Sequence, residues 1–381
     1  MKICAIICEY NPFHNGHLYQ MQEAKRLSKA DAILCVMSGS FVQRGEAAIV
    51  DKFTRAKHAV LAGADAVIEL PTVFATSNAE LFAKGAIALI SSIPDVTTLC
   101  FGAENADKSA FLESAKLLNN EPKEISEKIK ELSATGISYA KARALAWENL
   151  LPIDLLSSPN NILGLEYTKA ILAQKANIDI LPLQRIGGNY NDSNLQKNYS
   201  SATAIRTAIS KGENYKENLP DFVCEDMPSE IEKYLQTLKK YALLATPLNE
   251  IAKVCDCGEG LENALKKAAQ TDETLVESLT SARYTSSRIR RIALQNLLKI
   301  RESLIRDCLH SPLYLRILGT KKERKDVLSA LSQSSFPLLV RPRDENHLDG
   351  TARECYDVDV FAEKAYGLLY KNKTSIDVFV E

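Results

Sequence analysis

The chain has 381 residues, 46% of them hydrophobic and 25% charged, a balance typical of folded, water-soluble proteins that excludes disordered and fibrous classes. Chains of this length usually divide into two domains. The 47 Lys and Arg residues nearly cancel the 48 Asp and Glu residues, and the net charge of −1 by itself predicts no polyanionic partner.

The first 220 residues alternate short apolar runs with segments of helical periodicity, a pattern typical of a parallel sheet covered by helices. It predicts buried strands at residues 3–8, 32–37, 66–70, 96–101 and 178–183. Helices are predicted at residues 18–28, 51–62, 79–91, 107–119 and 162–174. Loops are predicted where Gly, Pro, Ser and Asn gather, at residues 38–45, 157–161 and 187–193. Ligands of such sheets bind beyond the carboxyl ends of the strands, so we expect these loops to surround a site.

The pattern changes after about residue 220. A junction rich in Pro and acidic residues leads into long helical patterns without a convincing strand until about residue 335. We therefore predict an α/β domain over residues 1–220 and a mainly helical domain over residues 221–381. Residues 336–381 combine a short apolar run at 337–340 with helical periodicity at 360–370, and their role stays open.

The nine cysteines have neither the spacing of a disulfide framework nor a Cys-x-x-Cys pair, which indicates reduced thiols in a cytoplasmic protein. Cys255 and Cys257 are the one close pair, and no Cys or His cluster nearby completes a zinc site, so we predict no metal held by the protein. The apolar N-terminus is too short for a signal peptide, and no run of 18 apolar residues predicts a membrane span. The oligomeric state stays open.

The most informative motif is His14-Asn15-Gly16-His17, directly after the first predicted strand. Two histidines three positions apart at a helix start can present their imidazoles on one side, and Gly16 lets a nucleotide approach the backbone. The helix dipole and its free amides favour phosphate. These parts suit an α-phosphate that gains charge while pyrophosphate leaves. Taken alone, such a motif more often marks incidental polar residues near a turn.

A second motif, Ser201-Ala202-Thr203-Ala204-Ile205-Arg206, stands near the end of the predicted first domain. Ser201 or Thr203 can cap a helix, and the guanidinium of Arg206 can reach the β- and γ-phosphates of a nucleotide. The ordered pair of motifs is far more specific than either one. We therefore predict His14, His17 and Arg206 as catalytic residues and Ser201 and Thr203 as nucleotide contacts.

The two motifs resemble those of the nucleotidyltransferase superfamily, relatives of the class I aminoacyl-tRNA synthetases, which implies a Rossmann-like first domain. Longer segments at residues 9–17, 38–46, 101–104 and 158–164 resemble the tRNA(Met) cytidine acetate ligase family. That resemblance implies an enzyme that activates acetate with ATP to acetyl-adenylate. It then transfers the acetyl group to N4 of the wobble cytidine of elongator tRNA(Met).

The resemblance also implies an ATP-binding stretch and single contacts further along the chain, with Mg²⁺ as the expected companion of ATP. The implied single contacts are Gly102, Asn160 and Arg185; the adjacent Asn161 is the alternative to Asn160. The stretch comprises Ile7, Cys8, Glu9, Tyr10, Asn11, Pro12, Phe13, His14, Asn15, Gly16, His17, Leu18, Tyr19 and Gln20. No function is attached to the thiol of Cys8.

Charge is unevenly distributed along the chain. Residues 281–325 hold twelve basic and three acidic residues, a net charge of +9, so the remainder carries −10. Such a run is often only a solvated helical face, but residues 283–291 combine cations with an aromatic ring and hydroxyls, a mixture that binds phosphates and unpaired bases. We predict tRNA binding by Arg283, Arg288, Arg290 and Arg291.

Several residues permit more than one interpretation. Residues 38–46 could be a mobile cover that carries Arg44 or only a polar surface loop. Asp51, Lys52 and Arg55 could be solvated charges or phosphate contacts, and the single Trp147 is expected in the core. Two rival functions stay open: a metabolic nucleotidyltransferase that transfers AMP or CMP to a small phosphorylated acceptor, and a non-catalytic RNA-binding protein.

Overall fold

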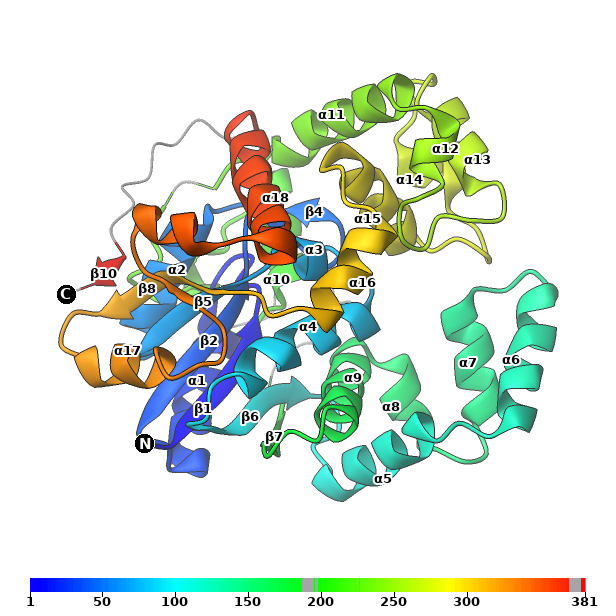
Figure 1. The fold of residues 1–381 in the computed structure, drawn as a ribbon. Coiled ribbons are helices and arrows are strands. Elements are labelled where there is room, and N and C mark those ends of the chain that lie inside the picture. Colours follow the sequence, from blue (N-terminus) through cyan, green and yellow to red (C-terminus); the bar gives the residue numbers. More distant parts are fainter. Residues whose placement is uncertain (187–194, 196–197, 226, 370–377, 381) are drawn as a thin grey trace.

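The computed structural model describes residues 1–186, 195, 198–225, 227–369 and 378–380. Its centre is an eight-stranded sheet in which seven strands follow the order β10-β8-β5-β2-β1-β6-β7, while β9 pairs with β8 (Figure 1). The strands of this sheet are β1 (Ile3–Cys8), β2 (Ala32–Ser38), β5 (Ala66–Leu70), β6 (Val96–Ala103), β7 (Asp179–Gln184), β8 (Leu315–Lys321), β9 (Leu338–Leu339) and β10 (Phe379–Val380).

The five strands predicted in the first part of the chain are confirmed, with ends that differ by at most two residues. They pair in parallel, as β1 does with β2 over its whole length. All residues of β1, β2 and β5 are buried, which explains why β1 is a continuous apolar run and why β2 and β5 depart from one only at Ser38 and Glu69. β6 extends past the predicted end, so Gly102 lies inside the strand rather than after it.

Helices cover both faces of the sheet. The connections β1–α1–β2 and β2–α2–β5 run in one direction and those through α4 and α9 in the other, so right-handed crossovers place the two pairs of helices on opposite faces. The helices of this layer arrangement are α1 (Asn15–Ser28), α2 (Lys52–Leu61), α3 (Thr72–Ala75), α4 (Ala79–Ser91), α5 (Lys108–Asn119), α8 (Ile153–Ser157), α9 (Pro159–Ala173) and α10 (Ala202–Lys211).

Side-chain caps fix where these helices begin. Asp51 accepts from the amides of Phe53 and Thr54 at the start of α2, and Asn78 accepts from the amide of Leu81 at the start of α4. Each cap satisfies an amide that has no partner within its helix. The helices predicted at residues 51–62 and 79–91 are thereby confirmed to within one residue.

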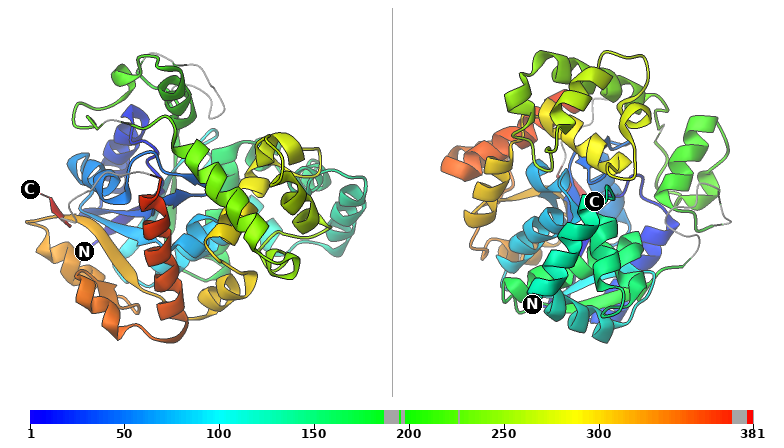
Figure 2. Two further views of the ribbon diagram at one scale, coloured as in Figure 1. Left: turned by 90° about the horizontal axis from the view of Figure 1, so that it is seen from above. Right: turned by 90° about the vertical axis from the view of Figure 1, so that its right-hand side faces the viewer.

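Two helices that we did not predict, α6 (Lys123–Ala134) and α7 (Tyr139–Trp147), project from the side of α5 and α9 (Figures 1 and 2). Trp147 is buried as expected, and its Nε1 donates to Oε2 of Glu121 across 3.2 Å. The turn between the two helices meets the later helical region, where the amide of Ser138 donates to the carbonyl of Ala282.

The helical region after the junction has a hydrophobic cluster of its own, separate from the main core. It contains Leu243, Ile251, Leu265 and Ile292, among others. The helices here are α11 (Ile231–Ala245), α12 (Leu248–Ile251), α13 (Leu261–Ala268), α14 (Leu275–Leu279) and α15 (Ser286–Leu297).

The prediction that residues 221–335 contain no strand is wrong. β8 pairs antiparallel with β5, and β10 adds a parallel strand beyond it. Arg316 interrupts the apolar run of β8, so the sequence pattern did not indicate a strand there. The remaining helices are α16 (Glu302–His310), α17 (Lys325–Leu331) and α18 (Gly350–Gly367). Residues of α18 belong to the main core, so the end of the chain packs with the first domain's sheet.

The predicted loops have different outcomes. Residues 38–45 contain the last residue of β2 and the strand β3 (Phe41–Val42), which forms a hairpin with β4 (Glu46–Ala47) just beyond them. The prediction of a loop at 157–161 is wrong except at Ser158, because α8 ends at Ser157 and α9 begins at Pro159. Residues 187–193 lie outside the described residues. Helix α18 begins ten positions before the helical pattern predicted at 360–370. In the described chain no helix is both long and apolar enough to cross a membrane.

Candidate active site

His14 and His17 form the start of α1, at the carboxyl end of β1. His14 is the N-cap residue, and its Nδ1 accepts from the amide of Gly16 across 3.1 Å. Nδ1 of His17 accepts in turn from the amide of His14 across 3.3 Å, which completes a reciprocal capping box. The two rings stack with their centroids 3.7 Å apart. Because each Nδ1 is an acceptor, the proton of each neutral imidazole sits on Nε2, which is left as a donor.

Both imidazoles are neutral at physiological pH in this arrangement. Burial, with the nearby charges of Arg185 and Arg206, lowers the pKa of His14 to about 3. Burial and the proximity of His14 and Arg185 likewise hold the pKa of His17 well below its ordinary value. The pair therefore offers two oriented N–H donors rather than two positive charges, and the fixed cations of the site are arginines.

Position 16 must be a glycine because the ring of His14 packs against it. A Cβ atom at this position would lie 2.9 Å from Cε1 of His14, so any other residue would displace the capping ring. We had expected the glycine to make room for a nucleotide. The structure adds a local reason, since the absent side chain lets His14 fold back on the amide of Gly16.

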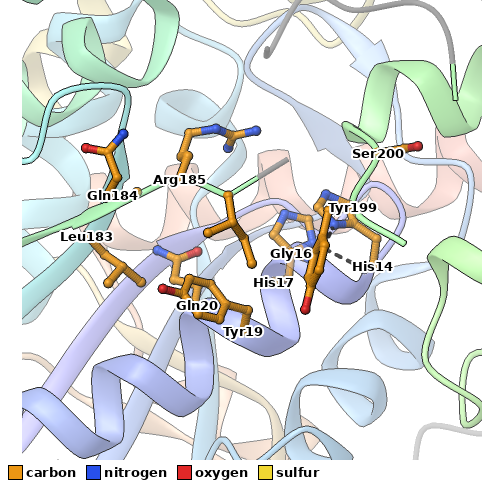
Figure 3. Close-up of a pocket in the computed structure, with 12 residues that line it drawn as sticks. His14, Gly16, His17, Tyr19, Gln20, Leu183, Gln184, Arg185, Tyr199 and Ser200 are labelled. Carbon is orange, nitrogen blue, oxygen red and sulfur yellow. Dashed lines mark hydrogen bonds between the residues drawn. The ribbon is translucent and has the colours of Figure 1, made fainter. Parts of the chain in front are cut away.

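Two adjoining cavities meet at the histidines. The smaller, of about 450 Å³, extends from α1 to the end of β7, where Arg185 lies across from His14 and His17 (Figure 3). The larger, of about 1080 Å³, extends from the same residues toward the β3–β4 hairpin and α10. Both cavities are lined by His14, His17, Gln20, Gly102 and Arg185.

Most of the implied ATP-binding stretch lines one of these cavities, but not all of it. Pro12, Phe13, Asn15 and Leu18 line neither. Phe13 is fully buried and packs against the ring of His17 at 5.6 Å. Asn15 donates from Nδ2 to the carbonyls of Asn198 and Glu217, on either side of α10 in the sequence. These side chains hold the motif in place, and Asn15 keeps α10 beside α1.

Arg206 reaches the larger cavity from α10. Ser201 caps this helix by accepting from the amide of Ala204, as the motif predicted. The guanidinium of Arg206 donates to the carbonyl of Asn11 across 2.8 Å and lies 3.4 Å from Oε2 of Glu46. Thr203 lines the cavity and bonds to Arg206. Arg206 and the histidines therefore share one cavity, although they are almost 200 positions apart in the sequence.

Glu46 was not among the site residues that we predicted, yet it lines the larger cavity. Its carboxylate lies 3.4 Å from Arg206 through one oxygen and 3.4 Å from Arg290 of α15 through the other. The sequence signal was present, because Glu46 ends one of the segments that resemble the family. Glu46 joins the cavity to the helix predicted to bind RNA.

Of the two adjacent asparagines at the start of α9, only Asn160 lines the larger cavity. Its Nδ2 donates to Oε1 of Glu104 across 2.6 Å. Asn161 is fully buried, and its Oδ1 accepts from the amide of Glu104 across 2.9 Å. The geometry therefore favours Asn160 over Asn161 as the ligand contact.

Lys52 and Arg55 are neither solvated nor placed in the cavities, so both of our interpretations are wrong for them. Lys52 is 2% exposed and lies 2.9 Å from each of Glu69 and Glu363. Arg55 is fully buried and donates to the carbonyls of Glu9, Val50, Ser38 and Gly39. Lys52 joins β5 to α18 through these two carboxylates, and Arg55 holds together the backbone beneath the site.

The four arginines predicted to bind RNA lie in or next to α15, and each has an acidic or carbonyl partner. Arg283 pairs with Glu259, and Arg288 donates to the carbonyl of Asp256. Arg291 is only 12% exposed and lies 3.7 Å from Asp256. Arg283 and Arg290 are the more accessible, with 45% and 30% of their side chains exposed.

The chain matches the HIGH nucleotidyl transferase family over residues 1–378. Among named relatives, the tRNA(Met) cytidine acetate ligase of Thermoanaerobacter sp. (strain X514) is 38% identical, over 98% of this chain and 97% of the relative. That of Clostridium acetobutylicum is also 38% identical, over 99% and 98% of the two chains. The chain belongs to the tRNA(Met) cytidine acetate ligase family. The family resemblance found in the sequence is thereby confirmed.

Solved structures agree with this assignment. The apo crystal structure of Thermotoga maritima TmcAL superposes with a TM-score of 0.88 at 30% identity and covers 98% of this chain and 96% of its own. A second crystal form of that protein, bound with alpha-thio ATP, gives a TM-score of 0.85 at 30% identity over 98% and 95% of the chains. The α/β nucleotidyltransferase fold and the ligase class are therefore established for this family member.

Proposed function

We propose that this chain is an ATP-dependent ligase that activates acetate as acetyl-adenylate and transfers the acetyl group to N4 of the wobble cytidine of elongator tRNA(Met). The observation that carries the proposal is full-length similarity to tRNA(Met) cytidine acetate ligases, combined with a histidine pair and Arg206 around one cavity. Similarity over 98% of the chain includes the helical region as well as the α/β core.

Acetate is activated at the α-phosphate. Adenosine would occupy the smaller cavity, beside Gly102 and Arg185, with the phosphates directed into the larger one. A carboxylate oxygen of acetate attacks the α-phosphorus, the bond to the β-phosphate oxygen breaks, and pyrophosphate leaves. The Nε2–H groups of His14 and His17 donate to the oxygens that gain charge, which requires no proton transfer. Arg206 binds the departing phosphates and gives up its contact with Glu46.

Mg²⁺ is expected to accompany ATP, and we assign it no separate site among the described residues. Throughout the described residues, no group of three or more His, Cys, Asp or Glu side chains is placed to hold a metal ion. We propose that Mg²⁺ is held largely by the phosphates of ATP, as is common for this ion. No step is assigned to it.

We further propose that α15 and the loop before it face the tRNA, and that Arg283, Arg288, Arg290 and Arg291 contribute to this surface. We predicted a second domain over residues 221–381. Because β8 and α18 pack with the sheet, we now propose a smaller second domain, formed by α11–α15 around their separate hydrophobic cluster. A cytoplasmic location, where tRNA is used, goes with this proposal.

Labelled acetate tests the proposal against its rivals. The protein is incubated with labelled acetate, ATP and bulk tRNA, with each component omitted in turn. We expect label in RNA only in the complete mixture. A metabolic nucleotidyltransferase would release a nucleotide conjugate of a phosphorylated acceptor and leave the RNA unlabelled, and a non-catalytic RNA-binding protein would yield no acetyl-adenylate. Either result would contradict the proposal.

A further inference from the structure

One wall of the larger cavity is apolar. Phe82 of α4, Leu163 and Tyr167 of α9, and Phe101 of β6 line it. The ring of Tyr167 lies 6.0 Å from that of Phe101 and 6.5 Å from that of Phe82, so the three rings form one aromatic cluster, which reaches the cavity with 2–4% of each residue exposed. We call these four residues the aromatic wall.

The wall stands across the cavity from the phosphate-binding groups. α4 and α9 cover one face of the sheet, whereas α1, with His14 and His17, covers the other. The helices on both faces border the carboxyl ends of the strands, where the cavity opens. A molecule held on the aromatic wall therefore faces the place where the α-phosphate lies beside His14.

Glu9 lines the same cavity as the aromatic wall. Its Oε1 accepts from the amide of Gln43 across 2.7 Å, and Nε2 of Gln43 donates to the carbonyl of Ser77 across 3.1 Å. Ser77 immediately precedes Asn78, the N-cap residue of α4, which is the helix that carries Phe82. The hydrogen bond from Gln43 occupies only one carboxylate oxygen of Glu9. Burial raises the pKa of Glu9, opposed by the amide of Gln43 and the charge of Arg206.

Helix α15, which is proposed to face RNA, contacts the segment that leads into α4. Gln295 of α15 donates from Nε2 to the carbonyl of Thr76 across 2.9 Å, one residue before Ser77. Arg290, further toward the start of α15, pairs with Glu46 of the hairpin that also lines the cavity. A nucleotide loop bound along α15 is thus next to the cavity opening.

We propose that the aromatic wall and Glu9 form the subsite for the pyrimidine base that accepts the acetyl group. Aromatic side chains stack on unpaired bases, and a base must leave its stack to reach a buried acyl group. Glu9 accepts a hydrogen bond from the exocyclic amine of that base. This inference rests on the proposed function.

The reaction at this subsite balances without a further reagent. The amine nitrogen of cytosine attacks the acetyl carbon of acetyl-adenylate, and the new C–N bond replaces the C–O bond to the phosphate. AMP leaves with the electron pair of that bond. The proton lost by the amine passes to the carboxylate of Glu9, which later releases it to solvent.

A substitution that fills the wall tests the location of the base. Leu163→Trp adds bulk at the aromatic wall, and Ile162→Trp, one position earlier on α9 and outside both cavities, is its matched control. Two rates are measured: acetate-dependent ATP–pyrophosphate exchange and transfer of labelled acetyl to tRNA. We expect Leu163→Trp to lower transfer at least tenfold more than it lowers exchange, and Ile162→Trp to lower both alike. Equal effects of Leu163→Trp on both rates would overturn the proposed location.

Glu9→Gln tests the role of the carboxylate. The amide oxygen of glutamine can still accept from the amide of Gln43, so the local hydrogen bond survives while the proton acceptor is lost. Removal of a general base typically costs about 10²-fold or more. We expect transfer to fall by that factor relative to exchange, and transfer at an undiminished relative rate would overturn the role of Glu9. If the unaltered protein transfers no acetyl group, the proposed function itself fails, which these variants do not decide.

Discussion

His14 has two tasks that substitution can separate, because it caps α1 through Nδ1 and presents Nε2–H toward the cavity. Asparagine also caps helices well but offers no donor in the place of Nε2. We expect His14→Asn and His14→Ala each to lower acetate-dependent ATP–pyrophosphate exchange by about 10²-fold or more, the usual cost of one lost donor. Only His14→Ala should also lower the free energy of unfolding, by about 1 kcal/mol. Near-normal exchange in His14→Asn would show that the ring takes no part.

The neutrality of His14 predicts a pH dependence of stability. Its pKa is lowered to about 3 in the folded protein and returns to about 6.5 on unfolding. Below pH 6.5 the unfolded chain therefore binds a proton that the folded chain does not, so the stabilisation present above pH 6.5 is lost as the pH falls toward 3.

Urea unfolding of the ATP-free protein measures this effect. We expect the difference in unfolding free energy between the unaltered protein and His14→Asn to change by about 2 kcal/mol between pH 7 and pH 5, in favour of the variant at pH 5. Comparison with the variant cancels the opposite contributions of groups such as Glu9 and Asp359, whose pKa values burial raises. A difference that does not depend on pH would contradict the neutral imidazole.

Site residues that belong to motifs of distinctive spacing and chemistry were predictable from the sequence. Other residues that line the cavity were not. His14, His17 and Arg206 were found because their motifs occur in a fixed order at a strand end and a helix start. We did not consider Phe82 and Tyr167, because an aromatic residue on a helix that covers a sheet is far more often core than site. Lys52 and Arg55 were misread because the sequence does not show their partners, which are the carboxylates of Glu69 and Glu363 for Lys52 and backbone carbonyls for Arg55.

At the scale of elements, the β3–β4 hairpin joins the cavity to the helical region. Gly45 adopts a positive φ of 74°, and a Cβ atom there would lie 2.6 Å from the backbone of Arg290 and Arg291. The buried ammonium of Lys239 on α11 donates to the carbonyl of Gly45 across 2.8 Å. The hairpin therefore fixes the position of α15 relative to the cavity.

Gly45→Ala tests this junction, with Gly212→Ala as a matched control. Gly212 also has a positive φ, 70°, but a Cβ atom there would meet nothing within 4 Å. The backbone strain common to both costs about 1 kcal/mol. We expect Gly212→Ala to lose about that much stability, and Gly45→Ala to lose clearly more and to transfer acetyl groups to tRNA poorly. Equal losses of stability would show that α15 does not press on the hairpin.

The accessible arginines next to and within α15 are expected to contact tRNA phosphates. Replacing Arg283 or Arg290 with alanine should weaken tRNA binding and reduce the slope of log K against log salt by about one unit each. Binding titrations at several salt concentrations measure both quantities. An unchanged slope in both variants would place the RNA on another surface.

Strands were predictable where an apolar run dominates them, and β8, which lies between β10 and β5, was missed because a charged residue stands near its start. β1 and, apart from Ser38 and Glu69, β2 and β5 are apolar runs because helices lie on each side. In β8, Arg316 stands within the strand because it lies 3.1 Å from Oε2 of the buried Glu69 in the neighbouring β5. The sequence shows the arginine but not its partner, some 250 positions earlier.

For the whole molecule, the positive charge of residues 281–325 does not form one surface. Arg283 and Arg290 belong to the region of α15, whereas Arg316 and Arg324 pair with Glu69 and Asp65 at the sheet. The excess of +9 in the sequence therefore overstates the charge available to RNA. One accessible member of the run, Arg290, lies beside the larger cavity through its pair with Glu46, and this contact supports the proposal that α15 faces the tRNA.

The central claim is that acetyl-adenylate formed beside His14 and His17 passes its acetyl group to a cytidine of tRNA(Met) in the adjoining cavity. A chase experiment tests it most directly. The protein is incubated with ATP and labelled acetate, freed of small molecules by gel filtration, and mixed with tRNA(Met) without further ATP. We predict that label stays with the protein as acetyl-adenylate and then appears in the RNA as N4-acetylcytidine at the wobble position. Label that never binds to the protein, or that stays bound when tRNA is added, would contradict the account.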